Sequence, residues 1–142
     1  MNDVDKGFLE GMTGYCLKNA YHSFLDHVEA DLAEFKLKVP EFSILAVVQI
    51  NPGITQTKLI DNLYVTRSTA SELIEKLVQR KLLQRKAINR KSHGLLISDK
   101  GEELFERAFK RAKEKELELN RNFTDKEVKQ LKSLLLKLVE NL

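Results

Sequence analysis

Apolar residues recur at helical spacing near the start of the chain. Between residues 8 and 35 they lie three or four positions apart, which is the period of one face of a long helix. That face consists of Phe8, Leu9, Met12, Cys16, Ala20, Phe24, Val28 and Leu32. A second helix is predicted from Pro40, which suits a first helical turn, to the turn sequence at residues 51–53. Because apolar residues cover most of its circumference, we expect this second helix to be buried on nearly all sides.

Two shorter helical patterns follow, and each begins at a threonine that can cap it. Thr55 precedes a helix expected to reach Leu63, and Thr66 precedes a helix with an apolar inner face. Residues 82–88 and 93–98 then predict two short strands joined by a polar, turn-prone sequence. This order of elements indicates a winged helix-turn-helix. In that motif the second short helix enters the DNA major groove and the strand hairpin, or wing, lies beside it.

Two long helices are predicted after the hairpin. Ser98 can cap the first, which we expect to end near Arg121. Residues 124–127 form the capping box Thr-Asp-Lys-Glu, which marks the start of the second helix. An apolar seam at heptad spacing follows, made of Val128, Leu131, Leu135, Leu138 and Leu142. The fold class is therefore expected to be mainly α with a small β-wing.

Charge is unevenly distributed along the 142 residues. Residues 66–100 hold nine Lys or Arg residues and three acidic ones, whereas the remainder holds 15 basic and 18 acidic residues. A basic island in an otherwise acidic chain is typical of a protein that binds a polyanion, although a solvated charged face has the same composition. No apolar run is long enough to span a bilayer, and the N-terminus lacks the pattern of a secretory signal. We therefore expect a cytoplasmic protein.

The side chains expected to contact DNA lie at the starts of the two short helices and on the wing. Arg67 can pair bidentately with guanine, and Glu72 can accept a hydrogen bond from cytosine N4. Backbone N–H groups at the helix starts can bind phosphate oxygens. Arg90, at the wing tip, is expected to enter the minor groove. The full set is Thr55, Gln56, Thr66, Arg67, Ser68, Thr69, Ser71, Glu72, Lys76, Arg85, Lys86, Asn89, Arg90 and Lys91.

Three segments of this region resemble the MarR family of bacterial transcriptional regulators. They are NPGITQTKL at residues 51–59, VTRSTASELIEKLVQRKLL at 65–83 and NRKSHGLLISDKG at 89–101. The family usually carries Asp-Arg-Arg at the wing turn and Leu-Thr after the second wing strand. This chain has Asn-Arg-Lys at residues 89–91 and Ile-Ser at residues 97–98 instead. The carboxylate that steadies the wing arginine in the family is thus replaced by the amide of Asn89, which can still bond that arginine.

The resemblance implies a homodimer that binds a palindromic DNA operator as a repressor in a bacterial or archaeal cytoplasm, associated with the nucleoid when bound. It divides the chain into an N-terminal dimerisation helix region (1–38), a winged helix-turn-helix lobe (40–100) and C-terminal dimerisation helices (101–142). The residues themselves also favour a dimer, because a lone winged helix does not need the long apolar seams at either end. Packing of the last seam within one subunit is the alternative.

MarR-like repressors commonly release DNA when a small aromatic or anionic compound binds between the dimerisation helices and the lobe. The residues expected to line such an effector pocket here are Tyr15, Tyr21, His22, Phe24, Phe42 and Leu45. An ordinary aromatic core is the alternative for each of them. The run Lys91-Ser92-His93-Gly94 is also similar to members that sense phenolic acids or their thioesters.

Other functions find less support in the sequence. Peroxide-sensing members of the family carry a reactive cysteine early in the first helix, which here is Cys16, but burial in an apolar helix face would leave this thiol inert. His22 and Asp26 share a helix face, yet two ligands do not make a zinc site, so no metal or cofactor is expected. No nucleophile–base pair or phosphate-binding glycine loop indicates an enzyme. A winged helix that binds proteins instead of DNA would carry apolar anchors where this chain carries hydroxyls and cations.

Overall fold

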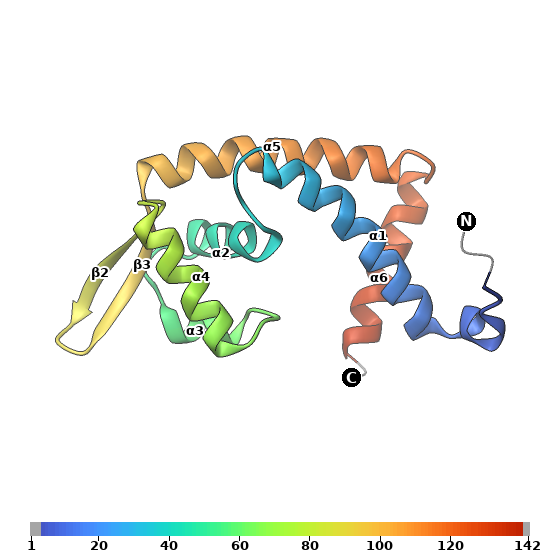
Figure 1. Ribbon diagram of the computed structural model, residues 1–142, viewed down its shortest axis with the longest axis horizontal. Helices are drawn as coiled ribbons and strands as arrows, with labels where there is room; N and C mark the ends of the chain where they lie inside the picture. The colour runs from blue at the N-terminus through green and yellow to red at the C-terminus, as the bar shows by residue number, and fades with distance from the viewer. Residues whose placement is uncertain (1–3, 141–142) are drawn as a thin grey trace.

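The computed structural model describes residues 4–140, and Leu142 of the predicted heptad seam lies outside this range. The described residues form six α-helices, a short 3-10 helix and a three-stranded sheet, and Figure 1 shows how they are arranged. The 3-10 helix spans Gly7–Gly11. The α-helices are α1 (Thr13–Ala33), α2 (Val39–Ile50), α3 (Gln56–Asp61), α4 (Arg67–Gln79), α5 (Asp99–Asn120) and α6 (Asp125–Glu140). The strands are β1 (Ile54–Thr55), β2 (Leu83–Asn89) and β3 (Ser92–Ile97).

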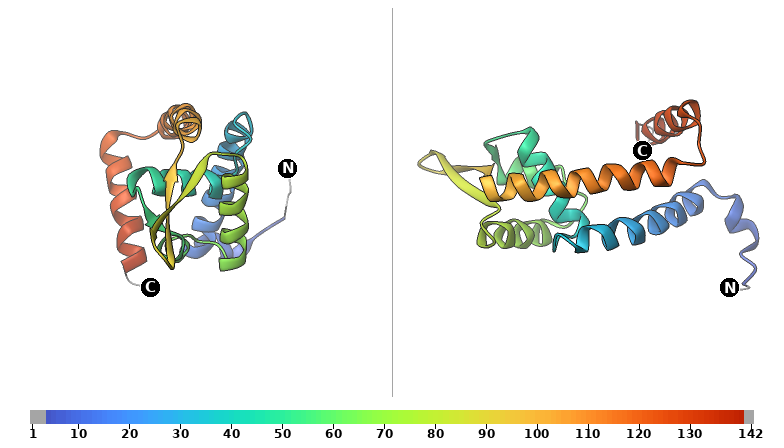
Figure 2. Two further views of the ribbon diagram at one scale, coloured as in Figure 1. Left: turned by 90° about the vertical axis from the view of Figure 1, so that its left-hand side faces the viewer. Right: turned by 90° about the horizontal axis from the view of Figure 1, so that it is seen from above.

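The molecule is elongated, and α5 runs along its length (Figures 1 and 2). At one end α2, α3, α4 and the sheet form a lobe, and at the other end lie the N-terminal half of α1 and all of α6. The sheet is antiparallel in the order β1-β3-β2, so β1 adds a third strand that the sequence pattern did not predict. No described helix combines the length and apolar composition needed to cross a membrane.

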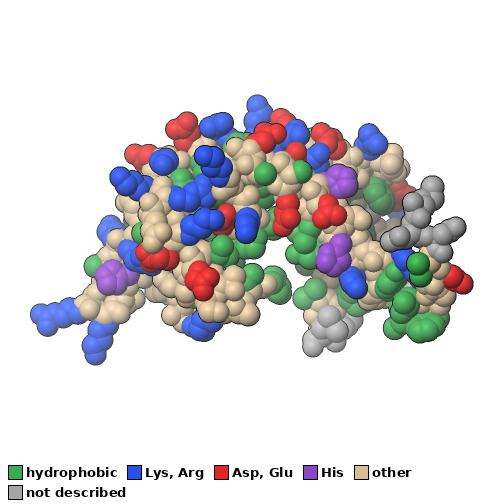
Figure 3. Space-filling view, viewed as in Figure 1, with side chains coloured by type: hydrophobic (Ala, Val, Ile, Leu, Met, Phe, Trp, Pro, Cys, Tyr) green, Lys and Arg blue, Asp and Glu red, His purple; other side chains and the backbone are tan. Residues whose placement is uncertain are grey.

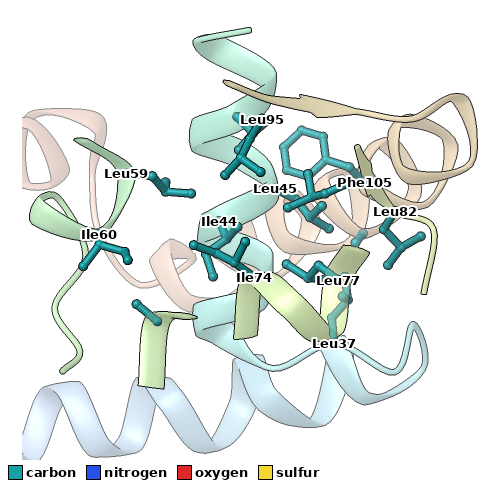
Figure 4. Packing of buried hydrophobic residues seen from close by; sticks show 14 of the residues in the cluster. Leu37, Ile44, Leu45, Leu59, Ile60, Ile74, Leu77, Leu82, Leu95 and Phe105 are labelled. Carbon is teal, nitrogen blue, oxygen red and sulfur yellow. The ribbon is translucent and has the colours of Figure 1, made fainter. Parts of the chain in front are cut away.

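The hydrophobic core lies within the lobe. Figure 4 shows side chains of α2, α4 and β3 converging with Phe105 of α5. The fully buried side chains include Ile44, Leu45, Val48, Leu59, Ile74 and Leu77. The expectation that α2 is buried on nearly all sides is wrong at its end, because Ile50 is 76% exposed. Ile50 is the last residue of α2 and is followed by the turn that begins the sheet, so no neighbouring element covers it.

Side-chain caps begin four of the predicted helices where the sequence placed them. Thr55 and Thr66 accept hydrogen bonds from backbone N–H groups three residues ahead, at 3.4 and 3.3 Å. Ser98 accepts one from Gly101 at 3.0 Å. At the capping box of α6, the Glu127 carboxylate accepts bonds from the backbone N–H and the hydroxyl of Thr124, and these bonds lower the pKa of Glu127.

The predicted helix over residues 8–35 is not continuous, because the 3-10 helix and a break at Met12 precede α1. Apolar side chains of this region remain open to solvent in the protomer, and Phe8 is 82% exposed. Only the C-terminal end of α1 is held to the rest of the molecule by buried charge. There Asp31 pairs with Arg111 of α5 at 3.0 Å and with Lys115 at 3.4 Å. Hydrogen bonds to carboxylates raise the pKa values of both cations. The main cause is the bond to Asp31 for Arg111 and the bond to Glu118 for Lys115.

Candidate nucleic-acid interface

The start of α4 presents a cluster of hydroxyl groups to solvent. The Thr66 hydroxyl lies 2.8 Å from that of Thr69 and 3.2 Å from that of Ser68, and all three residues are exposed. The opposite face of α4 is anchored, since Ala70, like Ile74 and Leu77, is fully buried. A helix buried on one face and polar on the other can lie in a groove without losing its packing. Ser71 is half-buried, so it is less available than its neighbours.

Arg67, the first residue of α4, is not free in the protomer. Its guanidinium donates a hydrogen bond to the Asp61 carboxylate at the end of α3, with 2.8 Å between Nη2 and Oδ1. Both side chains are exposed, so water screens their attraction and the pair contributes little to stability. A base edge or a phosphate can therefore replace Asp61 at low energetic cost.

Lys76 lies at the other end of α4 from the hydroxyl cluster and contacts α2. Its ammonium nitrogen is 3.0 Å from Oε1 of Glu41, whose side chain is fully buried. The second Glu41 oxygen accepts a hydrogen bond from the backbone N–H of Lys38 at 2.8 Å. Because an unpaired buried carboxylate is costly, Lys76 serves the α2–α4 contact in this structure. Glu72, one turn before Lys76, is exposed.

The wing projects from the lobe and ends in cations, as the space-filling view shows (Figure 3). Its turn consists of Arg90 and Lys91 alone, shorter than the four-residue turn that was expected. The side-chain Oδ1 of Asn89 accepts a hydrogen bond from the backbone N–H of Lys91 at 2.9 Å, so the Asn89 amide holds the turn and does not bond the Arg90 side chain. Arg85 pairs with Glu75 at 2.9 Å and so connects the wing to α4. Lys86 is exposed.

A small cavity of about 250 Å³ lies between the start of α3 and the wing. Its lining is polar and includes the expected residues Thr55, Gln56, Arg85 and Lys91. It also includes Thr57, Ser92 and His93, which sequence reasoning did not place at the DNA interface. The alternation of side chains along the wing strands could have placed His93 beside Arg85. Ala87 pairs with His93 and Arg85 with Leu95, so the side chains of these four residues lie on one face of the wing.

The residues expected at an effector pocket occupy different places in the protomer. Leu45 is fully buried in the lobe core, and the ring of Phe42 stacks on Phe105 with 5.4 Å between centroids. Tyr21, His22 and Phe24 are exposed on α1, and Tyr15 is half-buried there. A hydrogen bond with Asn19, together with the nearby Lys6 cation, lowers the pKa of the Tyr15 phenol. The protomer alone therefore does not enclose a pocket with these side chains.

Cys16 is exposed, contrary to the expected burial. Its sulfur lies 3.5 Å from the backbone carbonyl oxygen of Glu10 in the preceding 3-10 helix. The reason is that the short 3-10 helix covers little of the N-terminal half of α1, whose described residues are mostly exposed. Among the described residues, no three His, Cys, Asp or Glu side chains come together as a metal site, so His22 and Asp26 gain no third ligand.

Comparison with known proteins shows which proteins this geometry resembles. The family model described as MarR family matches residues 35–90, which cover α2 through β2 and end before β3. The transcriptional repressor CouR bound to a 23-mer DNA duplex is 28% identical, with a TM-score of 0.89 and coverage of 97% of this chain and 99% of that one. CouR bound to p-coumaroyl-CoA is 26% identical, with a TM-score of 0.89 and coverage of 99% and 100%.

A further similar structure is a MarR-family transcriptional regulator from Listeria monocytogenes complexed with a 26-mer DNA. It is 27% identical, with a TM-score of 0.78 and coverage of 88% of this chain and 85% of that one. No curated protein matches the sequence at a significant level. The family match spans the helix-turn-helix and all of the first wing strand, and the structural similarity extends over the flanking helices. The chain is thus similar to MarR-family winged helix-turn-helix transcriptional regulators, in the sequence of residues 35–90 and in its whole fold.

Proposed function

We propose that this chain is a repressor that binds a palindromic operator as a homodimer, with α4 in the major groove and the wing beside it. The observation that carries the proposal is the start of α4. Its exposed hydroxyls and Arg67 are held in place by a fully buried opposite face. The similarity to CouR bound to a DNA duplex, which covers 97% of this chain, supports DNA binding. Such a protein acts in the cytoplasm, on the nucleoid.

The dimer in this proposal is supported by the apolar surface at the far end of the molecule. None of the described residues of α6 is buried, although the helix carries a heptad seam. Leu131 is 44% and Leu135 is 38% exposed. A two-fold axis at this end would place two copies of α4 about 34–36 Å apart, one helical turn of DNA.

We further propose that an aromatic acid or its coenzyme A thioester releases the DNA. CouR, similar over 99% of this chain, has been solved with p-coumaroyl-CoA. In the space-filling view the underside of the molecule is hollowed between the lobe and the dimerisation helices, and apolar side chains line the hollow (Figure 3). A second copy of the chain would close this hollow and complete a pocket with residues of α1 and α2.

The test is selection of bound duplexes from a random DNA pool, followed by release of the selected duplex with a panel of compounds. We expect a palindrome with half-sites one helical turn apart. We also expect release by an aromatic acid or its thioester but not by peroxide. Release by peroxide that is lost in Cys16→Ala would instead assign a thiol-based sensor. Absence of any enriched duplex at low salt would reject DNA binding and favour a protein-binding winged helix.

Arg90→Ala tests the role of the wing. If Arg90 contacts the DNA backbone, the variant should bind every sequence more weakly, and its salt dependence should fall by about one phosphate contact. Fluorescence anisotropy over a series of salt concentrations measures both quantities. Lys126→Ala, which removes one cation from α6 at the far end of the molecule, is the matched control. Equal salt slopes for Arg90→Ala and the parent would show that the wing tip makes no phosphate contact.

A further inference from the structure

A second cavity lined by cations lies at the C-terminal end of α4, opposite to the start of α4 that would meet DNA. It has a volume of about 430 Å³, within the range of small-molecule sites. Its walls come from the residues that follow α1, the link between α4 and β2, and the first half of α5. The space-filling view shows Lys and Arg side chains gathered over this region (Figure 3). The lining residues are Glu34, Phe35, Lys36, Arg80, Leu82, Lys100, Glu103, Leu104 and Arg107.

Positive charge dominates the cavity. Four cations, Lys36, Arg80, Lys100 and Arg107, face two carboxylates. Within the described residues, neither Lys36 nor Arg107 forms an ion pair with a carboxylate. Two charges around one cavity are thus left without an anionic partner. Converging cations of this kind favour an anion with several oxygen atoms, such as a phosphate.

The other two cations are held in place before any ligand arrives. Arg80 donates hydrogen bonds to the backbone carbonyl oxygens of Lys36 at 2.8 Å and Phe35 at 3.5 Å. Lys100 donates one to the carbonyl oxygen of Arg80 at 3.3 Å. The Arg107 guanidinium lies 5.6 Å from the centroid of the Phe35 ring, so an aromatic surface adjoins the charges. Groups ordered in advance lower the entropy cost of binding.

A purely structural role accounts for only half of these residues. Arg80 and Lys100 cap the carbonyl ends of α1 and α4, where cations offset the helix dipoles. Lys36 adopts a left-handed backbone with φ of +53°, a conformation in which glycine would be less strained. Its side chain is exposed and makes no hydrogen bond to any described residue, so its charge is available to an anion.

We propose that this cavity binds a phosphorylated small molecule, with its phosphates among Lys36, Arg80, Lys100 and Arg107 and a planar group beside Phe35. The site differs from the proposed effector pocket, because it opens on the lobe at the C-terminal end of α4. It also lies away from the hydroxyl cluster that would meet DNA. The binding proposal does not depend on DNA recognition.

Isothermal titration calorimetry of the full chain without DNA, at constant ionic strength, tests the site. The probes are ADP, inorganic pyrophosphate and adenosine. We expect ADP and pyrophosphate to bind and adenosine to give no heat. Lys36→Ala combined with Arg107→Ala should weaken ADP binding at least tenfold, whereas Lys126→Ala combined with Lys137→Ala should leave it unchanged. No heat with either phosphate probe, or equal ADP affinity in the cavity variant and the control, would overturn the proposal.

Lys36→Gly separates binding from folding. Glycine relieves the strained backbone and removes the charge, so this variant should unfold at the same or a higher temperature than the parent and still bind ADP more weakly. Unchanged ADP affinity in a stably folded Lys36→Gly protein would show that Lys36 is not part of an anion site. A stable fold with weakened binding would support the site.

Discussion

At the scale of single residues, two cations of the proposed DNA interface are paired with carboxylates of the chain itself. Arg67 pairs with Asp61 and Arg85 pairs with Glu75, each at a nitrogen–oxygen distance below 3 Å. Exposed ion pairs are worth about 0–1 kcal/mol, so DNA can exchange its own oxygens for these carboxylates. Their physical effect is to compete with phosphates, which weakens binding to duplexes that offer no additional base contact to Arg67.

Asp61→Asn tests this competition. Removing the carboxylate leaves Arg67 free for phosphate or base contacts, so affinity for a random-sequence duplex should rise about two- to fivefold, as expected for an exposed pair. Fluorescence anisotropy at low and moderate salt measures the change. Asp125→Asn, on α6 at the far end, controls for the change in net charge. An Asp61→Asn protein that binds no better than this control would mean that Asp61 positions Arg67 instead of competing for it.

At the scale of elements, the wing is joined to α5 by a very close backbone contact. A Cβ atom added to Gly101 would lie 2.1 Å from the carbonyl oxygen of Leu82, at the base of β2. The Ser98 hydroxyl reinforces the junction, because it donates to the carbonyl oxygen of Lys81 at 2.6 Å while capping α5. Glycine at residue 101 thus lets α5 begin against the base of the wing, which couples the lobe to the dimerisation helices.

Gly101→Ala should therefore destabilise the protein by about 3 kcal/mol, since a backbone atom cannot move aside as a side chain can. Urea unfolding followed by circular dichroism measures the change. The matched control is Gly14→Ala in α1, where an added Cβ meets nothing within 4 Å and should stabilise the helix by about 0.5–1 kcal/mol. Similar unfolding free energies for the Gly101→Ala protein and the parent would show that the junction yields easily.

At the scale of the whole molecule, the two ends have different physical requirements. The lobe has its own core, so it folds around apolar side chains of α2, α4 and β3. The far end leaves Leu134 and Val139 exposed on α6, together with Phe8 before α1. The burial of apolar surface that usually stabilises such helices is available there only through a partner. The elongated shape of the protomer (Figure 2) follows from this division.

Leu131→Glu combined with Leu135→Glu tests the dimer. Charges on the seam should convert a protein of twice 16.4 kDa into one of 16.4 kDa by light scattering. Helical content should be largely retained, because neither leucine is buried in the protomer. Binding to a full palindrome should fall to that of a single half-site. Ser133→Glu, on the opposite face of α6, should leave the mass unchanged. If the double variant is still a dimer and binds the palindrome with unchanged affinity, the dimer interface does not include this seam.

Much of this architecture is readable from local sequence patterns. Helix periodicity, the caps at Thr55, Thr66 and Ser98 and the polar turn of the wing predicted five of the six α-helices and two of the three strands closely. These signals work because a cap or a helical face involves residues within a few positions of one another. The family resemblance, drawn from residues 51–101, was likewise confirmed by the family match.

Tertiary structure decided what the charged residues do. The sequence determined that residues 66–100 carry a basic surface, but the pairing of Lys76 with Glu41 and of Arg85 with Glu75 depends on which helices and strands meet. The same holds for Cys16, which lies in an apolar sequence pattern but is left exposed beside the short 3-10 helix. A helical or strand period reports which face is apolar, because it arises within one element. The partner of a charge and the covering of a face depend on contacts between distant elements, which only the packed chain supplies.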